Sequence, residues 1–154
     1  MAWTTPRTWV SGETVTAALM NAHVRDNLKA VGDAWTSYTP TVSNWTGGNG
    51  TSSGAYILAG KLVHFRVKFV FGSTSTAAGN FAATLPVTAV AARTFAFTAG
   101  AYDTSGTAHY GLTSLATSTT GLIVKQVDTN LSATVPFTWA TGDEIYVSGT
   151  YEAA

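Results

Sequence analysis

Residues 61–71 read Lys-Leu-Val-His-Phe-Arg-Val-Lys-Phe-Val-Phe, and this stretch decides the fold class of the chain. Its large apolar side chains recur at every second position, at Val63, Phe65, Val67, Phe69 and Phe71. The positions between them include His64, Arg66 and Lys68. Because successive side chains of a strand point to opposite faces, the pattern predicts a β-strand with one buried and one polar face.

Short runs rich in β-branched and aromatic residues surround this strand, and Gly, Ser and Thr punctuate them. Residues 44–54 and 117–120 are expected to form turns or loops, and Gly142-Asp143 a tight turn. The remaining runs are predicted to be strands, at residues 37–42, 56–59, 61–71, 81–85, 93–102, 109–115, 121–127, 131–139 and 144–151. Roughly eight strands with regular turns predict a jelly-roll-like antiparallel β-sandwich over residues 36–154 in a mainly β protein.

Before the sandwich, residues 14–35 carry the one convincing helical pattern. Thr14 or Thr16 can cap the N-terminus, and Gly32 is placed where a left-handed residue commonly ends a helix. Arg25 and Lys29 lie four residues apart on the solvent face, so no strong ion pair within the helix is expected. A helix of about 16 residues is marginal alone in water and must pack on something.

The apolar residues of this helix suggest what it packs on. The apolar positions are Val15, Leu19, Met20, Val24, Leu28, Val31 and Trp35, and from Met20 onward they form a seam with spacings of three or four residues, close to the period of packed helices. One interpretation is a helix that packs on the sheet of its own chain. The other is self-association of three copies around a short axis, which would make the protein a homotrimer.

Residues 1–13 are expected to form an extended arm, because Pro6 blocks a helix there and biases Thr5 to an extended backbone. Trp3 and Trp9 are too apolar to remain in water. Either they fold back on the helix or sheet of the same chain, or they anchor in a groove on another subunit, where Trp is enriched. Arm and helix together form an appendage, residues 1–35, to the sandwich domain.

Composition excludes several function classes. Of 154 residues, 45% are hydrophobic and only 10% charged, and the formal net charge is zero. Without a basic cluster, neither a nucleic-acid nor a membrane surface is expected. There is no cysteine, so disulfides and thiolate sites are excluded. No segment has the apolar length of a membrane span or a signal peptide, so use without Sec export is expected.

No catalytic or metal-binding motif is recognisable, and no cofactor is expected. His23, His64 and His109 lack metal-ligand spacing. Asp143 and Glu144 are adjacent and would point to opposite faces of a strand, which is poor geometry for a pair of glycosidase carboxylates. Asp143 fits a turn role after Gly142 better. The chain is therefore expected not to be an enzyme.

Aromatic residues that flank loops could instead stack on sugars, and the candidates are Trp45, Tyr102, Tyr110 and Trp139. The alternative is that these side chains pack on the sheet or between subunits.

Several stretches resemble a known group of proteins. They are Trp3-Thr-Thr-Pro6-Arg-Thr-Trp9-Val-Ser-Gly12-Glu13-Thr-Val15-Thr16-Ala17, Asn21 with Arg25-Asp26-Asn27-Leu28, Trp35-Thr-Ser-Tyr38-Thr39-Pro40-Thr41, Gly54-Ala-Tyr56, Gly60-Lys61, Leu85-Pro86, Pro136-Phe-Thr-Trp139-Ala-Thr-Gly142-Asp143 and Gly149-Thr-Tyr151-Glu152. Together they look like small virion structural proteins of tailed phages, mainly of actinobacterial-type hosts, described as minor tail, fibre or decoration-like proteins. The resemblance covers most of the chain.

The resemblance implies a structural protein of the virion surface, assembled in the host cytoplasm and in contact with major capsid or tail proteins. The chain has no fibre shaft or repeat, which favours a capsid decoration protein or a short head or tail appendage. The arm around Trp3, Pro6 and Trp9 would attach it. The alternative function is a tail-tip module that binds a host-surface carbohydrate.

Overall fold

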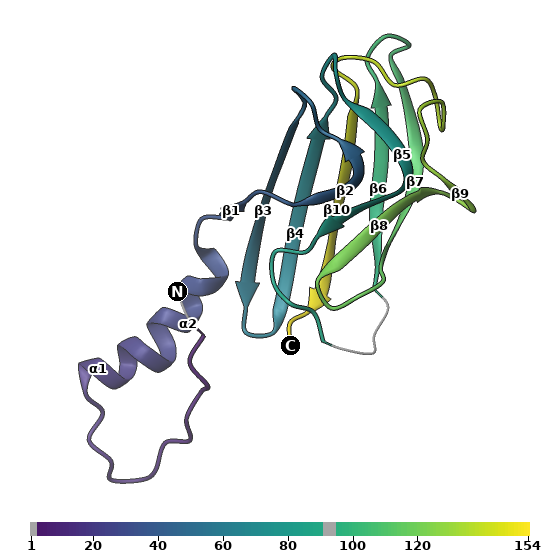
Figure 1. The fold of residues 1–154 in the computed structure, drawn as a ribbon. Helices are drawn as coiled ribbons and strands as arrows, with labels where there is room; N and C mark the ends of the chain where they lie inside the picture. Colours follow the sequence, from purple (N-terminus) through teal and green to yellow (C-terminus); the bar gives the residue numbers. More distant parts are fainter. Residues whose placement is uncertain (1–2, 91–94) are drawn as a thin grey trace.

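The computed structural model describes residues 3–90 and 95–154, and in these residues ten strands form one antiparallel sheet in the order β1-β3-β4-β10-β6-β7-β8-β5-β2, with β9 beside β8. The strands are β1 (Thr36–Tyr38), β2 (Val42–Thr46), β3 (Thr51–Ala59), β4 (Leu62–Val70), β5 (Thr76–Thr84), β6 (Ala96–Asp103), β7 (Ala108–Ala116), β8 (Gly121–Gln126), β9 (Thr129–Asn130) and β10 (Glu144–Glu152). Figure 1 shows the sheet curled so that β2, β5 and β8 lie over β3, β4 and β10. The predicted mainly β class, a jelly-roll-like sandwich after an arm and a helix, is confirmed.

One short segment joins the two edges of the curled sheet. β1 pairs with β3 at one edge, and β2 pairs with β5 at the other, although only residues 39–41 separate them. Thr41 and Thr84 secure the crossing, since the Thr84 N–H donates to the Thr41 carbonyl at 3.0 Å and the Thr41 N–H donates to Thr84 Oγ1 at 3.0 Å. Residues 36–46 therefore close the sandwich along one side and protect strand edges that would otherwise be open.

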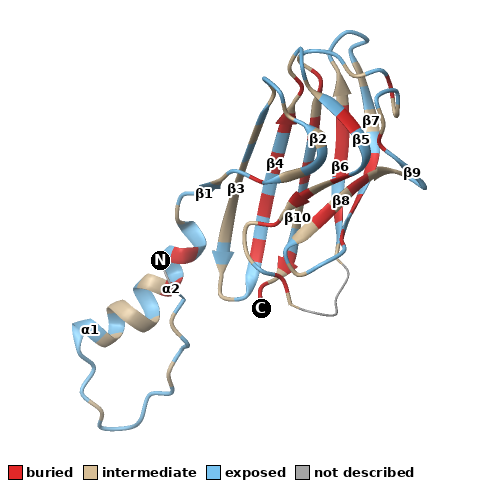
Figure 2. Ribbon diagram, viewed as in Figure 1, coloured by how far each residue is buried: buried red, intermediate tan, exposed pale blue. Residues whose placement is uncertain are grey.

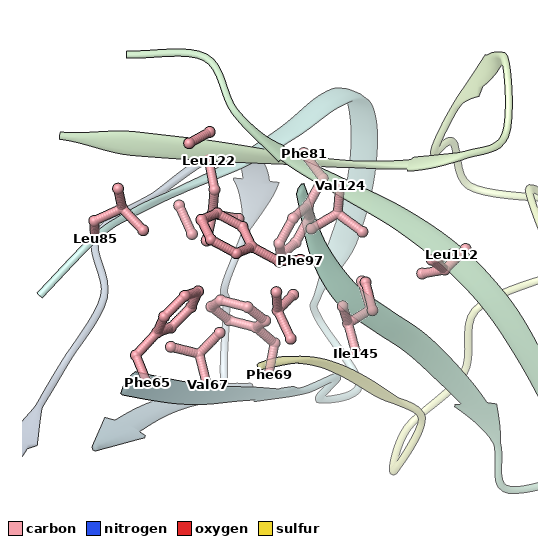
Figure 3. Close-up of a cluster of buried hydrophobic side chains, with 14 of the residues drawn as sticks. Phe65, Val67, Phe69, Phe81, Leu85, Phe97, Leu112, Leu122, Val124 and Ile145 are labelled. Carbon is pink, nitrogen blue, oxygen red and sulfur yellow. The ribbon is translucent and has the colours of Figure 1, made fainter. Parts of the chain in front are cut away.

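The core lies between the two layers. The inward side of β4 presents four of the five alternating apolar residues of the sequence pattern, and the fifth, Phe71, follows the strand directly; all five are buried, as predicted. In Figure 3, Phe65, Val67 and Phe69 face Phe81, Leu122 and Val124 of the opposite layer. Phe69 and Phe81 meet edge to face with ring centroids 5.0 Å apart. Each fully buried side chain of this kind contributes roughly 1.5–3 kcal/mol to folding.

The hairpin of β3 and β4, the turn at 117–120 and strands β7, β8 and β10 lie close to where the sequence predicts them. The prediction of a strand over residues 131–139 is wrong: this segment is a loop, and β10 pairs instead with β4 and β6. The predicted loop at 44–54 is shorter, because β2 and β3 extend into it and leave the turn 47–50. Residues 93 and 94 of another predicted strand lie outside the described residues.

The helix runs from Ala17 to Gly32 as α1 (Ala17–Met20), a π-helical turn η1 (Asn21–Arg25) and α2 (Asp26–Gly32). Thr16 is its N-cap, with Oγ1 accepting the Leu19 N–H at 3.3 Å. The expected left-handed end at Gly32 is wrong, since Gly32 is the last helical residue and Asp33 continues in an extended conformation. In Figure 1 the helix projects from one end of the sandwich, and the arm loops back along it.

Candidate functional site

A single amide side chain on α2 holds the arm to the helix. Asn27 is only 6% exposed. Its Oδ1 accepts the Thr4 N–H at 3.0 Å, and its Nδ2 donates to the Thr4 carbonyl at 2.7 Å and to the His23 carbonyl at 3.2 Å. The side chain thus pairs with the Thr4 backbone as a neighbouring strand would. Sequence reasoning missed Asn27, because nothing in the pattern distinguishes it from a solvent-facing helix residue.

The two arm tryptophans fold back on their own chain, the first of the two alternatives. The Trp9 ring meets His23 edge to face at 6.4 Å, and the Arg7 guanidinium lies 4.9 Å from the Trp9 ring centroid. Trp3 lies beside Gly60 in the turn between β3 and β4. Nevertheless Trp3 remains 42% and Trp9 38% exposed in the isolated chain. Each ring therefore keeps a large apolar surface open to a second contact.

The helix leaves most of its apolar seam exposed. Asn27 and Ala30, its buried residues, face the arm and β3. Four seam residues stay exposed and define the helix stripe: Met20, Val24, Leu28 and Val31. Leu28, at 70%, is the most exposed of them. Figure 2 shows the helix as mostly exposed or intermediate, whereas the sandwich has a buried interior. The stripe thus lacks the apolar cover that such a pattern normally has.

Three other predicted seam residues lie outside this stripe. Val15 is exposed but precedes the helix, and Leu19 is half-buried. The prediction that Trp35 continues the seam is wrong, because the helix ends at Gly32. The Trp35 ring packs instead on β4, 5.2 Å from the His64 ring and 4.6 Å from the Arg66 guanidinium.

Ion pairs flank the helix stripe. Lys29 pairs with Asp33 one turn further on, and Arg25 contacts the neighbouring Asp26 at 2.8 Å. Both pairs lie at the surface, where an ion pair contributes only about 0–1 kcal/mol, and Asp33 follows the last helical residue, so the expectation of no strong ion pair within the helix stands. The pairs neutralise the charges beside the stripe.

Of the four predicted sugar-stacking residues, three pack against the core. Trp45 lies 5.9 Å from Phe69, and Trp139 stacks on Phe71 with ring centroids 4.4 Å apart. Tyr110 lies 4.7 Å from Phe137. All three side chains are partly buried against the core, so the alternative interpretation, packing on the sheet, holds for them.

Tyr102 is the exception, because it lies on the outer face of β6. Its ring lies 4.6 Å from His109, and His109 Nδ1 lies 3.2 Å from the hydroxyl of Tyr146 on β10. The Tyr146 ring crosses Gly100, where a Cβ would approach it to 2.6 Å. Only glycine at this position allows the ring to lie against the sheet.

Beside Tyr146, the outer face of β3, β4 and β10 is hollowed into a groove of about 530 Å³. Its side chains come from two cross-strand rows of the sheet: Ser53, Lys68 and Tyr146 in one, Ala55, Arg66 and Ser148 in the other. Lys68 pairs with Glu144 at 2.6 Å, whereas Arg66 has no carboxylate partner among the described residues. The period-two pattern of β4 places Arg66 and Lys68 on a polar face, but no sequence feature singles out Tyr146.

Asp143, the carboxylate next to Glu144, has a structural role. Asp143 is fully buried at the turn before β10, where it accepts the Thr104 N–H at 2.9 Å and the Ala140 N–H at 2.6 Å. It therefore has the predicted turn role. Among residues 3–90 and 95–154, no group of three His, Asp or Glu side chains could hold a metal ion. The same residues contain no helix with the length and apolarity needed to cross a membrane.

No protein-family model, curated protein or solved structure matches this chain.

Proposed function

We propose that the protein is a non-enzymatic structural component of the surface of a tailed-phage particle, a homo-oligomer of three copies that the N-terminal arm attaches to a capsid or tail protein. The observation that carries the proposal is the helix stripe, an exposed apolar surface on a helix whose opposite side is already occupied by the arm. The segments that resemble small virion proteins supply the particle context.

Three copies of the helix stripe would cover one another around a common axis. Leu28 and Val31, two of the most exposed apolar residues of the chain, would lose their contact with water. Apolar surface removed from water stabilises an interface by about 25 cal/mol per Å². A short helix contributes little by itself, so repetition over three chains is what makes such an assembly stable.

The arm has a separate role in this proposal. Its backbone is held to the helix at Thr4, whereas the rings of Trp3 and Trp9 keep exposed surfaces that a groove on a capsid or tail protein could bury. Tryptophan is the residue that most often dominates such contacts. Assembly would take place in the host cytoplasm and leave the sandwich on the particle surface.

The test is deletion of residues 1–13, followed by quantification of the protein on purified particles by mass spectrometry. We expect a folded, oligomeric protein that no longer joins the particle. The matched control is Trp45→Phe, which changes a tryptophan inside the sandwich and should leave occupancy unchanged. Full occupancy of the truncated protein would refute the role of the arm, and absence of the intact protein from particles would refute the proposal.

Gold-labelled antibodies to the sandwich then separate head from tail. Label spread over the head indicates a capsid decoration protein, and label confined to the tail indicates a short tail appendage.

A further inference from the structure

We infer that the groove on the outer face of β3, β4 and β10 is a binding site for an acidic saccharide, with Arg66 holding the carboxylate of a uronic acid unit, Lys68 contacting the ligand from the neighbouring row and Tyr146 supporting the sugar ring. This site lies on the sandwich and is independent of the arm and the helix stripe. The four stacking candidates of the sequence are not among the side chains that line it.

The groove has the size and the polarity of a ligand site. Its volume of about 530 Å³ lies within the roughly 300–1,000 Å³ of small-molecule sites. Along the strands, the rows of Arg66 and Lys68 are two residues apart, so the two cations stand roughly 7 Å apart along β4 on the same face. A ligand that spans both rows can contact both cations.

Arg66 is poised for an anion. Its guanidinium rests against the Trp35 ring at 4.6 Å, and no side chain or backbone acceptor within the described residues takes its N–H groups. A guanidinium matches the two oxygens of a carboxylate with two parallel hydrogen bonds. Trp35 restricts the side chain to the face of β4, which lowers the entropy lost on binding.

Tyr146 supplies the apolar part of the site. It is 38% exposed, its ring is seated over Gly100, and its hydroxyl is tied to His109 at 3.2 Å. The ring is therefore held in place before a ligand arrives. The negative face of an aromatic ring attracts the C–H groups of a sugar ring. The hydroxyls of Ser53 and Ser148, on the adjoining strands, are available to the sugar hydroxyls.

The experiment is calorimetric titration of the full chain with a galacturonic acid oligomer and, in parallel, with a neutral galactose oligomer of equal length. We expect binding of the acidic oligomer only. Arg66→Gln and Tyr146→Ala should each weaken it at least about tenfold, and Lys68→Gln should weaken it as well. Lys125→Gln is the matched control, because it removes the same charge from β8 in the opposite layer.

Three results would overturn the inference: no binding of the acidic oligomer, equal binding of both oligomers, or acidic binding that survives both Arg66→Gln and Tyr146→Ala. The circular dichroism and the unfolding temperature of each variant must match the parent, which the exposed positions of Arg66 and Tyr146 favour. Because the titration uses isolated protein, its failure would leave the proposed attachment to the particle unaffected.

Discussion

At the scale of single residues, Asn27 is the contact whose loss should have the clearest effect. Its amide satisfies both the N–H and the carbonyl of Thr4. Removing one partner of such a bond leaves a polar group unsatisfied, at a cost of about 1–3 kcal/mol. The arm makes few other hydrogen bonds to the helix, so we expect that loss of the Asn27 amide detaches the arm and leaves the sandwich folded.

Asn27→Ala should therefore speed trypsin cleavage after Arg7 roughly tenfold, because cleavage requires the arm to leave the helix. Asn21→Ala is the control, since the Asn21 side chain makes no hydrogen bond with residues 3–13, the described part of the arm. Equal cleavage rates in the two variants, measured by mass spectrometry over time, would show that Asn27 does not hold the arm.

Because of Tyr151, the free energy of unfolding should depend on pH in the alkaline range. Burial raises the pKa of its hydroxyl from 10.0 to about 12, and burial also raises the pKa of Tyr38. The unfolded chain releases these protons near pH 10, whereas the folded chain keeps them. The contribution to stability is therefore complete below pH 10 and is lost as the pH rises toward 12.

The urea midpoint of the full chain should accordingly fall between pH 10 and pH 12. In Tyr151→Phe the urea midpoint should be lower at neutral pH, because the backbone of Val87 loses both of its hydrogen bonds to the hydroxyl. Between pH 10 and pH 12 the midpoint of this variant should fall less than that of the parent. Tyr102→Phe should reproduce the pH profile of the parent. An unchanged profile in Tyr151→Phe would contradict this assignment.

The same residues show how far sequence reasoning reaches at this scale. Alternation identified the inward residues of β4 because burial of a strand face follows directly from its geometry. Alternation could not decide between Trp45 and Tyr102 as exposed aromatics. That choice depends on which face of β2 and of β6 is turned toward the core, and this is a property of the assembled sheet. The role of Asn27 likewise exists only once the arm has folded back.

At the scale of elements, the helix was predictable and the last loop was not. Local signals define the helix, since Thr16 caps it and its apolar spacing is regular. Residues 131–139 have a strand-like composition, but Pro136 cannot donate to a ladder. The segment instead places Leu131 and Phe137 in the core as a loop, and β10 takes the central place in the sheet.

The helix stripe makes the prediction that belongs to this scale. In the proposed oligomer Leu28 would become buried, so Leu28→Ala should raise the dissociation constant at least about tenfold, which corresponds to about 1.4 kcal/mol. Lys29→Ala, next to it but outside the stripe, removes only its bond to Asp33 and should change the constant little.

Sedimentation equilibrium over a range of concentrations measures both constants. A parent protein that stays monomeric throughout the range, or an equal effect of the two variants, would show that the stripe does not join the copies.

At the scale of the whole molecule, the residues that stabilise the fold and those that the proposed assembly uses lie in different parts of the chain. Every buried hydrophobic residue among those described, apart from Ala30, lies between Val63 and Ala153. The appendage touches the sandwich mainly through Trp35 on β4, Ala30 beside β3 and Trp3 beside Gly60. The sandwich should thus fold without the appendage, provided that the crossing segment, residues 36–46, is kept.

Two fragments test this division of the chain. A fragment that begins at Trp35 should unfold cooperatively, because it keeps the core and both edge strands, and its free energy of unfolding should lie within about 1 kcal/mol of that of full-length Leu28→Ala, measured at a concentration at which this variant is monomeric. A monomeric reference is needed, since oligomerisation would raise the apparent stability of the parent.

A fragment that begins at Gly47 also lacks β1, β2 and the Trp45 ring, so β3 and β5 become open edges. We expect this fragment to aggregate or to lose cooperative unfolding. If the longer fragment failed as well, the helix would be part of the folding unit, and if the shorter one folded normally, closure by residues 36–46 would be dispensable.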